Sequence, residues 1–397
     1  MKQICFFEDE QCNHLNPLIL TRPADHLRIG ILKICEKWKE LLHPDQVTRL
    51  LRPELKNLFP APALQSDNDC LWINARFLPD TKMAAAIDKL DPDEGYTSNG
   101  APVIIKLSGE KSCSHFENRS IEFNDVSFRP LVSGSLLTHV TDIFQKNGDQ
   151  ITNDWSILNL PDKTNMDVKE ATVFGDHPVY AKGNVTIEPD VTFITTDGPV
   201  YLGEDATVMA GAVVRGPVVL GDHSYIKMNA KIYGETTIGP HSKVGGELHN
   251  VVIQGYSNKA HDGFLGNSVI GEWCNFGADT NNSNLKNNYS TVRLTDWPTR
   301  ETVDTGLQFC GTIMGDHCKT AINTNINTGS VFGVCCNIVT ASFPPKFLPS
   351  YSWLTDKGNH PYDLDKAIET AEMVMKRRNV AMTDEYRALM KYLFGKR

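Results

Sequence analysis

The feature of this sequence that most constrains its fold is a repeat of six residues in the second half of the chain. Aliphatic residues stand six apart without a break at Leu202, Val208, Val214, Leu220, Ile226, Ile232, Ile238 and Val244. Smaller residues follow four places later in each hexad, at Ala206, Ala212, Val218, Ser224, Ala230, Thr236 and Ser242. This period fits neither an α-helix nor the simple alternation of a strand. It predicts a left-handed parallel β-helix, in which each hexad supplies one short strand and one corner.

The same period extends in both directions. Earlier hexads begin at Val173, Val179, Val185 and Val191, with a slip of register near residues 195–199. Later ones begin at Phe264, Ile270 and Phe276, and the rhythm resumes at Met314, Thr320, Ile326, Phe332 and Ile338. Between them lies an Asn-rich excursion, Asp279–Thr305. A repeat that stops and restarts indicates a loop thrown out from the stack, and long loops on rigid scaffolds often carry function.

The first part of the chain alternates strand and helix patterns. Apolar runs predict buried strands at Ile4–Phe7, Cys70–Asn74 and Val103–Leu107, and amphipathic runs predict helices at Ile29–Leu42 and Thr81–Leu90, the second capped by Asp80. This alternation favours a Rossmann-like α/β domain with an open, mostly parallel sheet.

Two further amphipathic patterns follow Asp363 and Thr383, and they predict helices that cap the open end of the β-helix. The expected domains are therefore residues 1–165, 166–345 and 346–397.

Composition excludes several classes of function. The chain of 397 residues has a formal net charge of −9, which gives no attraction to nucleic acid or to an anionic membrane surface. No apolar run reaches the ~18 residues of a membrane-spanning helix, and the acidic residues at 8–10 leave no secretory signal. The ten cysteines are scattered without paired spacing, so we expect buried free thiols in a cytoplasmic protein.

Motifs in the second half resemble those of a known family. The segment Asn258–Gly266 reads NKAHDGFLG, which is similar to the acetyl-transfer segment of the bifunctional N-acetylglucosamine-1-phosphate uridylyltransferase / glucosamine-1-phosphate acetyltransferase family. Residues 274–278 (CNFGA) and 315–320 (GDHCKT) resemble two further stretches of that family. The resemblance implies a nucleotidyltransferase-type first domain, a hexapeptide-repeat acyltransferase domain and a homotrimer. It also implies acyl-CoA, with acetyl-CoA as co-substrate, a sugar phosphate and a nucleoside triphosphate as ligands.

The first half resembles a divergent branch of the sugar nucleotidyltransferases. Residues 14–24 (HLNPLILTRPA) echo a family motif, but the preceding loop, residues 7–13, has no glycine and carries three carboxylates. The family's Asn-Gly-Asp, whose aspartate binds Mg²⁺, reads Asn74-Ala75-Arg76. We therefore expect weak nucleotidyl transfer, with Mg²⁺ as a possible cofactor. Arg22, Arg28, Lys33 and Asn74 are the candidate nucleotide or sugar-phosphate residues, although the three cations are also compatible with a plain helix surface.

Acyl transfer from a thioester needs a base, a group that holds the acyl carbonyl, and a cleft for the pantetheine arm. His261 is the candidate base, because the pKa of histidine lies near neutral pH. The candidate substrate and acyl-CoA residues are Glu247, Lys259, Asn275, Asn281 and Lys286. A corner histidine bonded to backbone is the competing interpretation of His261.

Three other interpretations stay open. Nucleotidyl transfer is one, with the β-helix serving assembly, and a non-catalytic assembly or regulatory protein is another. The third is a zinc site, because His223 and His241 are 18 residues apart and should stack on one face of the β-helix. Of the positions that resemble the zinc ligands of γ-class carbonic anhydrases, only His249 is a histidine, so no metal is assigned.

Overall fold

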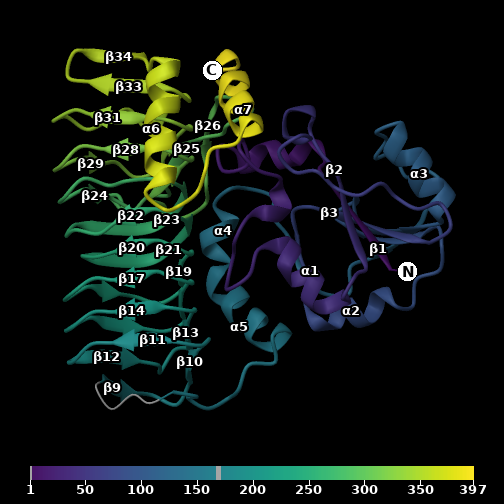
Figure 1. Ribbon diagram of the computed structural model, residues 1–397, viewed down its shortest axis with the longest axis horizontal. Coiled ribbons are helices and arrows are strands. Elements are labelled where there is room, and N and C mark those ends of the chain that lie inside the picture. The colour runs from purple at the N-terminus through teal and green to yellow at the C-terminus, as the bar shows by residue number, and fades with distance from the viewer. Residues whose placement is uncertain (1, 167–170) are drawn as a thin grey trace.

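The computed structural model describes residues 2–166 and 171–397, and it shows a long β-helix beside an α/β domain (Figure 1). Residue 1 and residues 167–170, at the expected start of the β-helix domain, lie outside the described residues. Helices α4 (Asp142–Gln145) and α5 (Asn147–Ile157) lie between the two bodies, and α6 (Leu364–Lys376) and α7 (Asp384–Gly395) lie at the upper end of the β-helix (Figure 1).

The α/β domain is built on a six-stranded sheet. In spatial order its strands are β2 (Gln46–Leu50), β1 (Gln3–Phe7), β3 (Cys70–Asn74), β6 (Ala101–Leu107), β5 (Glu94–Ser98) and β7 (Ser127–Pro130). The three expected strands are present and largely buried. The sheet is mixed rather than mostly parallel, because β6 pairs antiparallel with both β3 and β5. Asn99 and Gly100, both with positive φ, form the two-residue turn between β5 and β6, and Asn-Gly is a strong hairpin signal.

Local hydrogen bonds to backbone groups determine where the helices of this domain start. Helix α2 (Thr81–Ile87) starts as expected, with the Asp80 carboxylate accepting from the Met83 backbone N–H at 2.7 Å. Helix α1 spans Ile34–Leu42. It starts five residues later than expected, because Arg28 and Lys33 form a β-bridge around a turn at Gly30. The remaining elements are η1 (Glu10–Leu15), η2 (Ala24–His26), η3 (Pro53–Leu55), α3 (Gly109–Glu117), β4 (Phe77–Leu78) and β8 (Ser135–Leu136).

The β-helix is a prism with three faces. One, which we call the groove face, carries β11 (Val185–Ile187), β14 (Ala206–Val208), β17 (Tyr225–Ile226), β20 (Lys243–Val244), β22 (Asn258–Lys259), β28 (Lys319–Thr320), β31 (Asn337–Val339) and β33 (Ser352–Thr355). The second, the docking face, carries β10 (Val179–Ala181), β13 (Val200–Leu202), β16 (Val218–Leu220), β19 (Thr236–Ile238), β27 (Thr312–Met314), β30 (Ser330–Phe332) and β32 (Phe347–Leu348).

The third face carries β9 (Ala171–Phe174), β12 (Val191–Ile194), β15 (Val213–Arg215), β18 (Lys231–Ile232), β24 (Asn281–Asn282) and β29 (Asn325–Ile326). Two long strands, β21 (Glu247–Gly255) and β23 (Phe264–Glu272), start on the third face and run on to the docking face. The predicted stripes are confirmed: every residue of both, from Leu202 to Val244 and from Ala206 to Ser242, is at most 1% exposed. The aliphatic side chains fill the prism.

Two details of the repeat differ from expectation. Leu265 rather than Phe264 points into the prism, because the long strands β21 and β23 pass a corner without the usual turn. The excursion leaves the stack after β24 and returns at β27, so it spans residues 283–311 rather than Asp279–Thr305. It contains an antiparallel hairpin of β25 (Arg293–Thr295) and β26 (Thr302–Asp304).

The α/β domain docks on the docking face of the β-helix. Thr237 donates its hydroxyl to the Gly30 carbonyl at 3.0 Å, and the Gln254 amide exchanges two hydrogen bonds with the Arg28 backbone at 2.7 and 3.0 Å. Buried residues of both parts form one apolar cluster, which also includes Val292 and Leu294 of the excursion. The two parts therefore share a core.

The two C-terminal helices start after the expected residues, Asp363 and Thr383, which are their N-cap residues. They pack along the side of the last coils, while the edge strand β33 pairs with β34 (Gly358–Pro361). The Tyr351 hydroxyl donates to the Met390 carbonyl at 2.8 Å, and apolar side chains of α7 pack with Leu51 and Leu55 of the first domain. Helix α7 thus fills the junction between the β-helix and the α/β domain (Figure 1).

Within residues 2–166 and 171–397, none of the helices has the length and apolar character needed to cross a membrane. All ten cysteines are free thiols, and all but Cys113 are buried, as expected.

Candidate functional site

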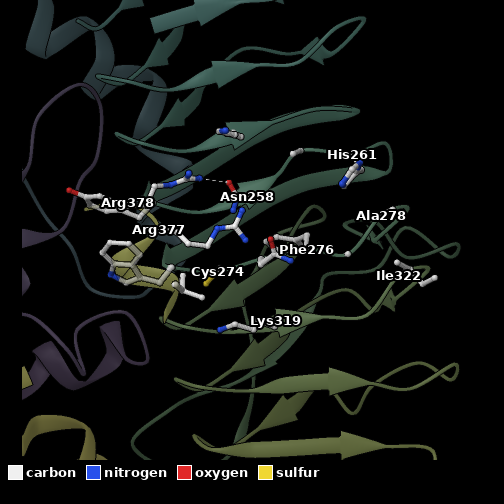
Figure 2. Close-up of a pocket in the computed structure, with 16 residues that line it drawn as sticks. Asn258, His261, Cys274, Phe276, Ala278, Lys319, Ile322, Arg377 and Arg378 are labelled. Carbon is white, nitrogen blue, oxygen red and sulfur yellow. Dashed lines mark hydrogen bonds between the residues drawn. The ribbon is translucent and has the colours of Figure 1, made fainter. Parts of the chain in front are cut away.

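A groove of about 630 Å³ crosses the groove face of the β-helix beside the end of α6. Its floor is formed by successive coils and one wall by residues at and after the end of α6. The lining residues are Lys243, Tyr256, Asn258, Ala260, His261, Trp273, Cys274, Asn275, Phe276, Gly277, Ala278, Lys319, Ile322, Val374, Arg377 and Arg378. Figure 2 shows His261 toward one end and Arg378 toward the other, with Asn258 and Phe276 between them.

The groove is strongly cationic. Lys243, Lys319, Arg377 and Arg378 line it, and no aspartate or glutamate among the described residues does so. Arg378 donates to the Asn258 side-chain oxygen at 3.0 Å, so its guanidinium is held over the floor (Figure 2). Partial burial and the neighbouring Arg378 lower the pKa of Lys243, because both disfavour its charged form. Such a surface attracts a ligand that carries several negative charges.

His261 lies at the corner that follows β22, and its side chain is exposed at the groove. Asn275 lies on the groove face one coil further, bridged through backbone pairing to Asn258 below and Lys319 above. The structure therefore brings His261 and Asn275 to one surface. An imidazole and an amide there supply a base and a hydrogen-bonding group at the same cleft.

Lys259 does not line the groove, contrary to expectation. Its side chain points into the prism, is 2% exposed, and occupies the position paired with Val244 of the coil below. The motif placed it near His261, but strand alternation turns Lys259 away from Asn258, which lines the groove, and His261 lies beyond the corner that ends β22.

Glu247, Asn281 and Lys286 also lie away from the groove. Glu247 and Asn281 are on the third face, where Asn281 accepts from the Phe264 backbone N–H at 2.7 Å. Lys286 is in the excursion and donates to the Thr291 carbonyl at 2.5 Å. The excursion leaves from the corner between the third and docking faces, so nearness in sequence to His261 does not bring it to the same face.

An aromatic column runs along the corner between the docking and groove faces. The rings of His223 and His241 stack with centroids 4.8 Å apart, as predicted from their spacing. The stack continues through Tyr256, Trp273 and His317, at separations of 4.7, 4.1 and 6.2 Å. These corner residues share a positive φ, so their rings project in register from coil to coil. Tyr256 and Trp273 bring this column into the groove wall.

His249, the third candidate zinc ligand, lies apart from the stacked pair of His223 and His241. His249 is on the third face, where its ring meets Tyr233 edge-on at 5.6 Å. Elsewhere, Asp25, His26 and Cys35 bring possible ligand atoms within 4.8 Å of one another. Arg49 donates to the Asp25 carboxylate at 2.8 Å, and a guanidinium beside these atoms opposes a divalent cation.

The loop expected to hold nucleotide phosphates is occupied by its own ion pairs. Glu8 binds Arg52 at 2.8 Å and accepts from the Ala24 backbone N–H at 2.7 Å. Asp9 accepts from Arg76 at 2.9 and 2.5 Å and from the Asn74 amide at 2.8 Å. Because the buried Arg76 cation stands where the family has its metal-binding aspartate, these residues do not fit Mg²⁺.

The three candidate cations of the first domain lie close together in sequence but differ in surroundings. Arg22 binds Glu272 at 2.9 Å and also Asp316, both on the β-helix. Arg22 and Lys33 line a pocket of about 230 Å³ at the junction of the domains. Arg28 donates to the Ile31 carbonyl and lies 3.8 Å from Glu36. Arg22 therefore joins the first domain to the β-helix. Asn74, which donates to Asp9, stabilises the loop of residues 7–13.

Sequence reasoning missed Arg377 and Arg378. They follow α6 directly, after Lys376, so the only signal was a run of three cations at the end of an amphipathic helix. Such a run is usually a solvated helix end. What makes it part of a site is the packing of α6 beside the groove face.

Comparison with known families gives one match in the first domain and one within the β-helix. Residues 4–161 match the family described as sugar nucleotidyl transferase, and residues 199–233 match bacterial transferase hexapeptide repeats. A search of curated proteins gave no match. The chain thus contains one segment similar to sugar nucleotidyl transferases and one similar to transferase hexapeptide repeats.

Proposed function

We propose that this two-part transferase acts in nucleotide-sugar biosynthesis by moving an acyl group, such as acetyl, from acyl-CoA to an amine or hydroxyl of a sugar phosphate at the groove. One observation carries the proposal: a groove has His261 at one end and Arg377 and Arg378 at the other, and none of the carboxylates that the structure describes lines it. Acyl-CoA carries several phosphates on its nucleotide and a thioester at the far end of a long arm. The cations therefore suit the nucleotide, and His261 suits the reacting end.

The step is a direct acyl transfer. His261 takes a proton from the acceptor amine or hydroxyl while that nitrogen or oxygen attacks the thioester carbonyl. The carbon–sulfur bond breaks, a carbon–nitrogen or carbon–oxygen bond forms, and the leaving thiolate receives the proton from the imidazolium. Asn275 lies on the adjacent coil, where its amide can donate to the carbonyl oxygen as negative charge develops there.

The first domain is proposed to be a weak nucleotidyltransferase. The paired carboxylates of its loop and the burial of Arg76 support this view, since the charges that would meet a triphosphate are already neutralised. A protein whose only role is assembly is less well supported, because such a protein has no use for an unneutralised cationic groove.

We also propose that the active assembly is a homotrimer. A prism with flat faces suits side-by-side packing, and Glu247 and Asn281 on the third face would then approach a neighbour's groove. Light scattering at micromolar protein should give three times the chain mass of 44.2 kDa. A monomer mass would contradict both the trimer and a site shared between subunits.

The test of the proposed function is free-thiol release from acyl-CoA in the presence of a panel of sugar phosphates. His261→Asn and His261→Gln keep polar contacts but remove the base, so turnover should fall by about 10²–10⁴-fold. His360→Gln, on the exposed edge strand β34 and away from the groove, is the matched control and should behave as wild type. Melting temperature and oligomer mass should stay unchanged in all variants.

If the His261 amide variants keep nearly wild-type turnover with the true acceptor, His261 is structural and the proposed mechanism is wrong. If no acyl-CoA and sugar phosphate pair releases thiol, the acyl-transfer function itself is wrong.

A further inference from the structure

A lysine lies inside the β-helix at a position that belongs to the aliphatic stripe. Lys259 pairs with Val244 of the coil below, and the bridge between Asn258 and Asn275 places Phe276 above it. Both neighbours are buried, and Lys259 itself is 2% exposed. A cation in an apolar prism is costly unless all its protons have acceptors.

All three protons of the Lys259 ammonium have backbone acceptors. Its Nζ donates to the carbonyls of His261 at 2.6 Å, Asp262 at 2.8 Å and Gly245 at 3.4 Å. Two of these carbonyls belong to the corner that carries His261. They turn toward the inside of the prism, where carbonyls without a donor would be left unpaired.

The same corner depends on a glycine. Gly263 has φ of +110°, and a Cβ there would lie 2.3 Å from the Thr280 carbonyl oxygen of the next coil. The corner therefore combines a backbone shape that favours glycine with inward carbonyls that need an internal donor. Lys259 supplies that donor at the usual distance of a charge-assisted hydrogen bond.

His261 receives its orientation from this backbone. Across residues 2–166 and 171–397, no hydrogen bond or ring contact holds the His261 side chain itself, although many other histidines have such partners. We infer that Lys259 is a positioning residue for His261, which fixes from inside the prism the corner that presents the imidazole to the groove. This inference rests on the proposed function, in which His261 is the base.

The charge of Lys259 depends on pH within an accessible range. Burial lowers its pKa to about 8, and the carboxylates that oppose this shift are Asp262 on the same corner and Asp279 on the next coil. Above that pH the neutral amine has only two protons for three carbonyls, and its lone pair faces one of them. The corner should loosen, so turnover should fall as pH rises through about 8.

Lys259→Met tests the inference, because methionine has similar length and no proton to donate. Val244→Met is the matched control, since it changes the paired interior residue one coil away from the corner. In Lys259→Met we expect kcat to fall by about 10²-fold, as for a misplaced catalytic group. KM for acyl-CoA should stay close to wild type, and the loss of turnover near pH 8 should disappear. Val244→Met should keep the wild-type kcat and pH profile.

Hydrogen exchange gives a second measurement that does not depend on activity. The peptide covering residues 258–264 should exchange faster in Lys259→Met than in wild type, and Val244→Met should not show this change. If Lys259→Met keeps the wild-type kcat and still loses turnover near pH 8, the inference is overturned and the proposed function stays intact. If wild type shows no acyl transfer, the proposed function fails, and unchanged exchange in Lys259→Met would then refute the role of Lys259 in holding the corner.

Discussion

The loop of the first domain and the groove of the β-helix are both rich in cations, yet they use them in opposite ways. In the loop and at the junction, Arg52, Arg76 and Arg22 each bind a carboxylate of the chain itself. In the groove, Arg377 and Lys243 face a cleft that no carboxylate among the described residues lines. A cation that already has an anionic partner stabilises the fold, whereas one without such a partner is available to a ligand.

This contrast has a structural origin. The first domain is packed against another body on the side of Arg22, so its charges must be paired to be buried. Beside the groove, the described part of the chain places α6 and the residues that follow it, and the groove cations keep contact with water. The number of arginines and lysines is therefore a poor guide to phosphate binding. What matters is which of them have no carboxylate within reach.

The largest expected effect concerns the two reactions themselves. Pyrophosphate release from a nucleoside triphosphate and a sugar phosphate should be at least ~10³-fold slower than thioester cleavage, because groups that neutralise the transferring phosphate contribute that much. Parallel assays of the two products on one preparation measure the ratio. Comparable rates would mean that paired arginines can still serve a triphosphate.

The next effect concerns stability at the junction. Arg22→Met should lower the free energy of unfolding by about 3 kcal/mol, because it leaves Asp316 buried without its cation. Burial already raises the pKa of Asp316 despite Arg22. The double variant Arg22→Met/Asp316→Asn should recover a large part of the loss in denaturant titrations. A double variant no more stable than Arg22→Met would show that the pair is not what joins the domains.

A smaller effect is expected for ligand binding. Arg377→Glu/Arg378→Glu should raise KM for acyl-CoA by about 100-fold, which corresponds to about 2.7 kcal/mol, with little change in melting temperature. Lys366→Glu/Lys391→Glu makes the same change of charge on α6 and α7 away from the groove. Equal effects of the two pairs would point to net charge rather than to a phosphate site.

The smallest effect concerns the excursion. Asp296 binds His14 at 2.8 Å and Thr299 at 2.8 Å. Burial opposes ionisation, but these hydrogen bonds outweigh it and hold the pKa of Asp296 below its usual range. Asp296→Asn should cost about 1 kcal/mol of stability at pH 7. Since a lowered pKa stabilises above the unfolded value of about 4, this difference should shrink as pH falls below that value, and a difference that grows would contradict the assignment.

The sequence predicted the β-helix well because its signal is periodic and each hexad faces the same environment. Leu202 through Val244 are buried as a set, and the stack of His223 on His241 follows from the coil length. The hairpin at Asn99-Gly100 also has a local signal, because an Asn-Gly pair favours a two-residue turn. The late start of α1 had none, because it depends on the bridge between Arg28 and Lys33.

The site was predicted only in part. His261 and Asn275 were chosen from a motif, and both line the groove, while their roles stay a prediction. Lys259 was misplaced because its neighbours in the motif hid its position in the aliphatic stripe. Arg377 and Arg378 could not be found, since which face α6 covers is decided by packing far from it in sequence. Pairings such as Arg22 with Asp316 are equally invisible before the domains are docked.

The packing of α7 against the first domain also bears on how the chain is made. Leu55 ends η3, and Asp384 begins α7 about 330 residues later. At typical rates of synthesis, α7 is therefore made roughly 20 seconds to a minute after η3. During that interval Leu51 and Leu55 lack the side chains that cover them in the finished protein. The nascent first domain therefore has an apolar patch for chaperones to recognise, and release from them should coincide with the emergence of α7.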